Sequence, residues 1–138
     1  MKTVFADTAY WIAVVRPSDQ WAEAVKRARS LLGDVCLLTT DEVLAEFLTA
    51  LSGGGEHLRR MAAQMVRAIL DNPNVKVIPQ SRDSFLTGLA LYEQRLDKEY
   101  SLTDCISMNA MRAEGLTEVL TNDHHFAQET FTVLMTEK

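Results

Sequence analysis

Short apolar segments alternate with longer segments of helical periodicity, and this alternation constrains the fold more than any other feature of the chain. Residues 35–38 are apolar at every position, as expected for a strand that is buried on both faces of a parallel sheet. Four more short strands are predicted at residues 3–6, 75–78, 119–120 and 131–134. Because helical segments separate the strands, the pattern predicts an α/β/α fold, in which helices flank a parallel sheet of four to five short strands.

Helix boundaries are marked by residues that cap or break helices. A first helix is expected over residues 8–15, Gly33 ends the second, and the glycines at 53–55 separate the third from the fourth. The predicted N-caps are Asp19, Thr40, Ser81 and Thr103. Two helices carry apolar stripes at helical spacing: Trp21, Ala24, Val25, Ala28, Leu31 and Leu32; and Leu58, Met61, Ala62, Met65, Val66 and Ile69. In the helix after the third strand, the buried side is expected to be Phe85, Leu89, Tyr92 and Leu96.

The composition fits a single folded domain over residues 1–138. Hydrophobic residues make up 47% of the chain and charged residues 24%, which excludes a disordered protein. No apolar run approaches the roughly 20 residues of a membrane span, and the amino terminus lacks a signal peptide, so we expect a cytoplasmic protein without membrane association. Cys36 and Cys105 lie in apolar segments and are expected to be buried thiols. The net charge of −5 argues against a general nucleic-acid coat protein but not against a nuclease.

Four acidic residues are expected at the carboxyl edge of the sheet, where open parallel sheets bind their ligands. Asp7 ends the first strand, and Asp123 lies just past the fourth. Glu46 lies about two turns into the helix that follows the second strand, and Asp104 lies in the first turn of the helix that Thr103 is expected to cap. Their positions in the chain therefore predict that the four carboxylates converge.

Carboxylates packed together repel one another unless a cation neutralises them or their pKa values rise. Oxygen ligands of this kind suit Mg²⁺ or Mn²⁺. A divalent ion beside a phosphodiester can activate water and stabilise the charge on the leaving oxygen. The acids therefore indicate metal-dependent hydrolysis of phosphodiester bonds.

Each acid also has a purely structural interpretation. Asp7 can cap the first helix, Asp104 is favourable to a helix dipole in any first turn, and Asp123 can be a turn residue. Glu46 is harder to explain structurally because it lies beside an apolar stripe. Zinc is a weaker alternative, since the cysteines and the pair His124 and His125 lack CxxC-type spacing.

Four segments carry a resemblance to a known family. They are Asp7-Thr8 after the first strand, Val-Leu-Ala-Glu-Phe at 43–47, Ser-Leu-Thr-Asp-Cys at 101–105 and Thr-Asn-Asp-His-His-Phe at 121–126. Together they resemble PIN-domain proteins and, more narrowly, the VapC-like toxins of type II toxin–antitoxin pairs. The resemblance implies an endoribonuclease that depends on Mg²⁺ or Mn²⁺. Its catalytic and metal-binding acids map onto Asp7, Glu46, Asp104 and Asp123.

The resemblance also implies supporting residues and partners. Thr8 and Thr103 match hydroxyl positions near the metal, Thr121 is a third candidate, and Asn122 stands where some relatives place another acid. The implied partners are an RNA substrate, a cognate antitoxin protein and a second copy of the chain. A free-standing PIN nuclease of RNA processing and a non-catalytic PIN-fold interaction module are the alternatives.

Two surfaces are candidates for contacts with these partners. The dimer is expected to use the helices around Trp21 and residues 61–65, whose apolar stripes are broad. Arg59, Arg60 and Arg67 are candidate contacts for RNA phosphates, although a solvated helix face is the simpler explanation.

Overall fold

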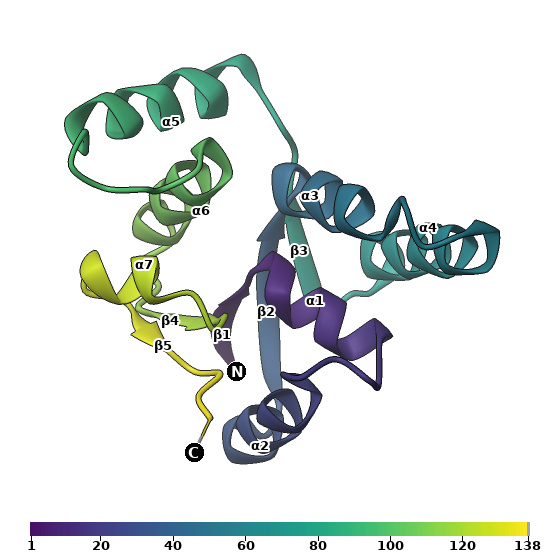
Figure 1. Cartoon of the computed structure of the whole chain (residues 1–138). Helices are drawn as coiled ribbons and strands as arrows, with labels where there is room; N and C mark the ends of the chain where they lie inside the picture. The colour runs from purple at the N-terminus through teal and green to yellow at the C-terminus, as the bar shows by residue number, and fades with distance from the viewer. Residues whose placement is uncertain (138) are drawn as a thin grey trace.

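The strands form one parallel sheet at the centre of the molecule (Figure 1). The computed structural model describes residues 1–137, and its strands are β1 (Lys2–Ala6), β2 (Val35–Thr40), β3 (Val75–Ile78), β4 (Glu118–Leu120) and β5 (Thr132–Val133). They lie in the order β3-β2-β1-β4-β5, and every neighbouring pair is parallel. This confirms the predicted α/β fold.

Seven helices lie within the described residues: α1 (Thr8–Val15), α2 (Ala22–Leu32), α3 (Asp41–Leu51), α4 (Glu56–Asp71), α5 (Arg82–Gln94), α6 (Leu102–Ala113) and α7 (His124–Gln128). Figure 1 shows α1, α3 and α4 on one side of the sheet and α5, α6 and α7 on the other. The short helix α7 was not predicted from the sequence. None of the helices in residues 1–137 has the length and apolar character that a membrane crossing requires.

The core lies between the sheet and these two groups of helices. Among its largest fully buried side chains are Phe5, Leu38, Phe47, Met108, Leu120 and Phe126, from β1, β2, α3, α6, β4 and α7. The caps at Thr40 and Ser81 are confirmed, because each hydroxyl accepts a hydrogen bond from the backbone N–H three residues later. The cap predicted at Asp19 is wrong by two residues: its carboxylate accepts from the N–H of Trp21, which itself stands at the N-cap of α2.

The buried face predicted for α5 is wrong. Phe85, Leu89 and Tyr92 are 42%, 37% and 48% exposed, and Leu96 lies beyond the end of the helix. The helix instead buries Gly88 and Leu91. A Cβ atom at Gly88 would lie 2.5 Å from Cγ1 of Ile106 on α6, so the glycine lets the two helices approach closely.

The other two stripes are buried only in part. In α2 the alanines and Val25 are buried, but Leu31 is 90% exposed at the end of the helix. In α4 only Ala62 and Ile69 are fully buried, and Met61 is exposed. Both cysteines are free thiols: Cys105 is buried, as predicted, whereas Cys36 is only half-buried on β2.

Candidate active site

The predicted site lies where the strand order of the sheet reverses. The chain runs from β1 outward to β2 and β3, and then returns to place β4 on the other side of β1. Ala6 at the end of β1 lies beside Leu120 at the end of β4, and the N–H of Asp7 donates to the carbonyl of Leu120 at 3.1 Å. Such a switch point opens a crevice at the carboxyl ends of the two strands, where open α/β sheets bind ligands.

Asp7 occupies this crevice and is only 6% exposed. It stands at the N-cap of α1, yet its carboxylate makes no capping hydrogen bond, so the helix does not explain it. Its Oδ2 atom instead accepts from the hydroxyl of Thr121 at 2.9 Å. Burial, with smaller contributions from the charges of Asp104 and Glu46, raises the pKa of Asp7 to about 7.

Glu46 reaches the same crevice from α3. It is half-buried and precedes Phe47, which is fully buried in the core. The hydroxyl of Thr8, in the first turn of α1, donates a hydrogen bond to Oε1 of Glu46. Thr8 therefore orients the carboxylate of Glu46 next to Asp7.

Asp104 enters from the first turn of α6. The sequence predicted Thr103 as the cap of this helix. That prediction is wrong: α6 begins at Leu102, and its cap is Ser101. Oδ2 of Asp104 accepts from the N–H of Ser101 at 3.0 Å, and the N–H of Asp104 donates to Oγ of Ser101 at 3.0 Å, which completes a capping box. Burial, followed by the nearby charge of Asp123, raises the pKa of Asp104.

Asp123 and His125 complete the crevice from the short helix α7. Oδ1 of Asp123 caps that helix by accepting from the N–H of His125 at 2.9 Å, and the N–H of Asp123 donates to Thr121 at 3.2 Å. Nδ1 of His125 lies 3.2 Å from Oδ1 of Asp123 and 3.6 Å from Oδ2 of Asp104. His125 was not assigned to the site from the sequence. The signal that points to it is its place in the turn that Asp123 caps.

The structure therefore brings the four predicted acids to one edge of the sheet, and contacts link them. Thr8 joins Glu46 to the start of α1, Thr121 joins Asp7 to Asp123, and His125 lies between Asp123 and Asp104. Two supporting candidates lie further out. Thr103 lines a groove with Arg82 and Phe85, and Asn122 is half-buried beside Asp123.

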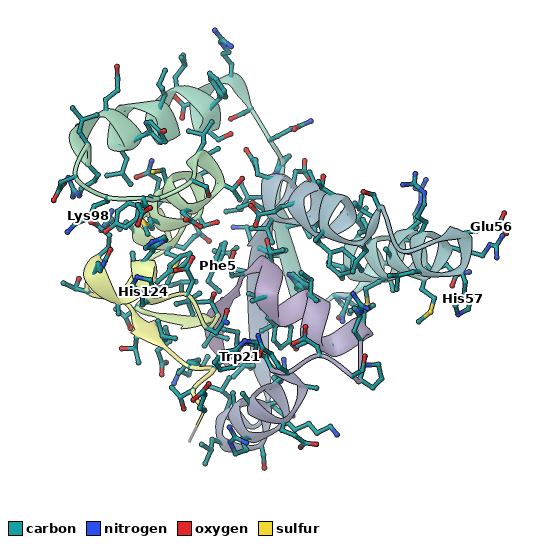
Figure 2. All side chains as sticks on the ribbon, in the orientation of Figure 1. Phe5, Trp21, Glu56, His57, Lys98 and His124 are labelled. Carbon is teal, nitrogen blue, oxygen red and sulfur yellow. The ribbon has the colours of Figure 1, made fainter. Side chains whose placement is uncertain are left out.

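The three candidate arginines lie on α4, which carries none of the four acids. All three are exposed; Arg59 donates to the carbonyl of Ser52 at 3.1 Å, and Arg60 pairs with Glu56 at 3.7 Å. Figure 2 shows Glu56 and His57 at the outer end of α4, on the opposite side of the molecule from His124. The role of the three arginines in RNA binding stays a prediction.

The donor atoms at the crevice fit a divalent metal ion. Among the described residues, none of the four acids pairs with a lysine or an arginine. Asp123, His124 and His125 offer ligand atoms that lie within 4.8 Å of one another. Carboxylates without a lysine or arginine partner, next to imidazole nitrogens, form a donor set that a divalent ion would neutralise.

Comparisons with known proteins agree with this architecture. The structure resembles the crystal structure of VapC20 of Mycobacterium tuberculosis, which is described as a toxin that cleaves the sarcin-ricin loop. The two share 23% sequence identity and a TM-score of 0.81, over 94% of this chain and 96% of that chain, which shows a common fold. No curated protein sequence matches. A family model described as the PIN domain matches residues 4–130, and the chain therefore belongs to the PIN-domain family.

Proposed function

We propose that this protein is a metal-dependent endoribonuclease that hydrolyses RNA phosphodiester bonds. One observation carries the proposal: Asp7 is buried beside two other carboxylates, at a pKa raised to about 7 by burial and by their charges. A fold does not need this repulsion for stability, whereas a metal-binding site does need closely placed carboxylates. The nuclease activity of the PIN-domain family supports the same conclusion.

Each residue of the crevice has a role in this reaction. Asp7, Glu46, Asp104 and Asp123 would hold Mg²⁺ or Mn²⁺, directly or through water. The ion, when bound, would activate water and stabilise the negative charge on the leaving oxygen. Thr8 orients Glu46, and Thr121 orients Asp7 by donating to Oδ2. By analogy with the PIN-domain family, water would attack phosphorus in line with the P–O3′ bond, and breaking that bond would leave 3′-hydroxyl and 5′-phosphate ends.

A cleavage assay on the purified protein tests this function. RNA should be cut in the presence of Mg²⁺ or Mn²⁺, cutting should stop in EDTA, and added metal should restore it. Full activity in EDTA would contradict the proposal and move the chemistry to side-chain acid–base catalysis, with His57, His124 and His125 as candidates.

We further propose that the protein is the toxin of a type II toxin–antitoxin pair and acts in the cytoplasm. The similarity in fold to VapC20, a toxin that cleaves RNA, supports this over a free-standing PIN nuclease. The intact set of acids argues against a non-catalytic module. Expression should arrest growth, and a small protein encoded beside this gene should co-purify and relieve the arrest. Growth without arrest, with cleavage intact in vitro, would favour the free-standing nuclease.

We also propose that the chain forms a homodimer, and the structure offers two apolar faces for it. The helices expected from the sequence expose Met61, whereas α5 exposes Phe85, Leu86 and Tyr92 at 42–48%. Light scattering should give about 31 kDa, twice the 15.5 kDa chain. Leu86→Glu and Met61→Glu then compare the two faces, and the one that dissociates the dimer identifies the interface. Monomers at all micromolar concentrations would contradict the proposal.

A further inference from the structure

One polar atom at the crevice lacks the partner that burial demands. Nδ1 of His125 is buried and makes no hydrogen bond within residues 1–137. It nevertheless lies 3.2 Å from Oδ1 of Asp123, which is close enough for an ion pair but without the geometry of a hydrogen bond. A buried ring nitrogen without a partner costs about 1–3 kcal/mol, so its position calls for an explanation.

We propose that Nδ1 of His125 is a ligand of the metal ion, in addition to the carboxylates. This inference rests on the proposed metal-dependent function and adds a nitrogen donor to it. Metal–ligand bonds of roughly 2.0–2.2 Å place two adjacent ligand atoms about 3 Å apart. The separation between Nδ1 of His125 and Oδ1 of Asp123 matches that spacing, and Oδ2 of Asp104 lies only slightly further from Nδ1, at 3.6 Å. The ligand must be the tautomer that carries its proton on Nε2.

The surroundings of His125 hold its ring in place. The ring packs edge to face against Tyr100, with centroids 5.3 Å apart. The hydroxyl of Tyr100 donates to Glu129 at 2.9 Å, and Glu129 in turn pairs with Arg95 at 2.9 Å and with Arg112 at 2.8 Å. Supporting contacts of this kind fix a metal-binding imidazole before the ion arrives. By contrast, the side chain of His124 is 76% exposed, which makes it the weaker candidate.

A nitrogen ligand changes which metal the site prefers. Carboxylates and water suit Mg²⁺ and Mn²⁺ alike, whereas imidazole favours the transition metals. With His125 as a ligand, the centre should therefore prefer Mn²⁺ over Mg²⁺ more strongly than the four acids alone would. Replacing His125 by asparagine should lower the Mn²⁺ affinity by about tenfold and the Mg²⁺ affinity by about threefold or less.

Electron spin-echo spectroscopy of the full chain loaded with Mn²⁺ tests the ligand directly, because it detects nitrogen bound to the metal. The parent and His124→Asn should both show the nitrogen coupling, and His125→Asn should lose it. Asparagine places an amide near the position of Nδ1, so the change removes the imidazole and keeps a polar side chain in its place. If His125→Asn does not fold, all histidines can be labelled with ¹⁵N in the His124→Asn protein. The remaining histidines are then His57, which lies on α4, and His125, so a ¹⁵N coupling to Mn²⁺ identifies His125 as the ligand.

The outcomes separate this inference from the proposed function. Mn²⁺ binding without any nitrogen coupling, or with a coupling that survives in His125→Asn, would overturn the role of His125 and leave the four acids as the site. Loss of the nitrogen coupling in His124→Asn would show that His124 is the ligand in place of His125, and it would overturn the inference as well. Failure of the parent to bind Mn²⁺ at all would overturn both proposals.

Discussion

Asp104 combines a structural role and a proposed chemical role in one side chain. Its Oδ2 atom completes the capping box of α6, while burial and the charge of Asp123 raise its pKa. The two roles can be separated because an asparagine keeps an oxygen that can accept from Ser101, but it loses the charge. Paired substitutions therefore measure each role on its own.

Asp104→Asn should lower RNA cleavage by on the order of 10²–10³-fold while the protein stays folded, because the amide binds a divalent ion poorly. Ser101→Ala removes the cap and keeps the carboxylate, so it should cost about 1 kcal/mol of stability and leave most of the activity. Cleavage rates under metal-saturating conditions and chemical denaturation check both variants. Undiminished cleavage by Asp104→Asn would remove this residue from the site.

At the scale of whole elements, the packing of α5 on α6 depends on a single glycine. Gly88→Ala places a methyl group 2.5 Å from Cγ1 of Ile106, which is a branched and stiff side chain. Overpacking costs about 1–3 kcal/mol and should outweigh the roughly 1 kcal/mol gained in helix propensity. Denaturation of Gly88→Ala, Ile106→Ala and the double variant should show that the glycine change costs less when Ile106 is already shortened. Equal costs in both backgrounds would show that the two residues do not clash.

This helix also shows where sequence reasoning succeeds and where it stops. Strand positions, the α/β class and the caps at Thr40 and Ser81 follow from local patterns, and the structure confirms them. The buried face of α5 does not follow from local patterns. Apolar residues occur on more than one side of the helix, and Gly88 has no side chain to give an apolar signal. The contact that decides the packing is between residues 88 and 106, which no local pattern links.

The same limit applies to the site. Asp7, Asp104 and Asp123 follow from strand ends and a helix start, and Glu46 follows from its place beside an apolar stripe, so their convergence could be expected. His125 could not be assigned in this way, because α7 is only five residues long and its own periodicity is too short to read. The orientation of its ring depends on Tyr100, which lies 25 positions earlier in the chain and meets it only in the folded structure.

At the scale of the whole molecule, two clusters of charge respond to pH in opposite directions. Hydrogen bonds from Arg95, together with those from Arg112 and Tyr100, lower the pKa of Glu129 to about 2 despite its burial. Its stabilising contribution is present above its ordinary value of 4.5 and is lost as the pH falls toward 2. The crevice behaves in the opposite way, because there no cation within residues 1–137 balances the carboxylates except through histidine.

The metal-free protein should therefore become less stable as the pH rises from about 4 to about 7. The pKa of Asp7 rises from 3.8 in the unfolded chain to about 7 in the folded state, so the folded state binds more protons throughout that interval. A pKa difference of this size corresponds to on the order of 4 kcal/mol. Asp7→Asn should abolish most of this dependence: in EDTA it should melt above the parent at pH 8 and close to it at pH 4. Mn²⁺ should stabilise the parent by mass action and the variant by less. A variant that melts below the parent at pH 8 in EDTA, with no effect of Mn²⁺ on either protein, would show that Asp7 stabilises the fold and does not belong to a metal site.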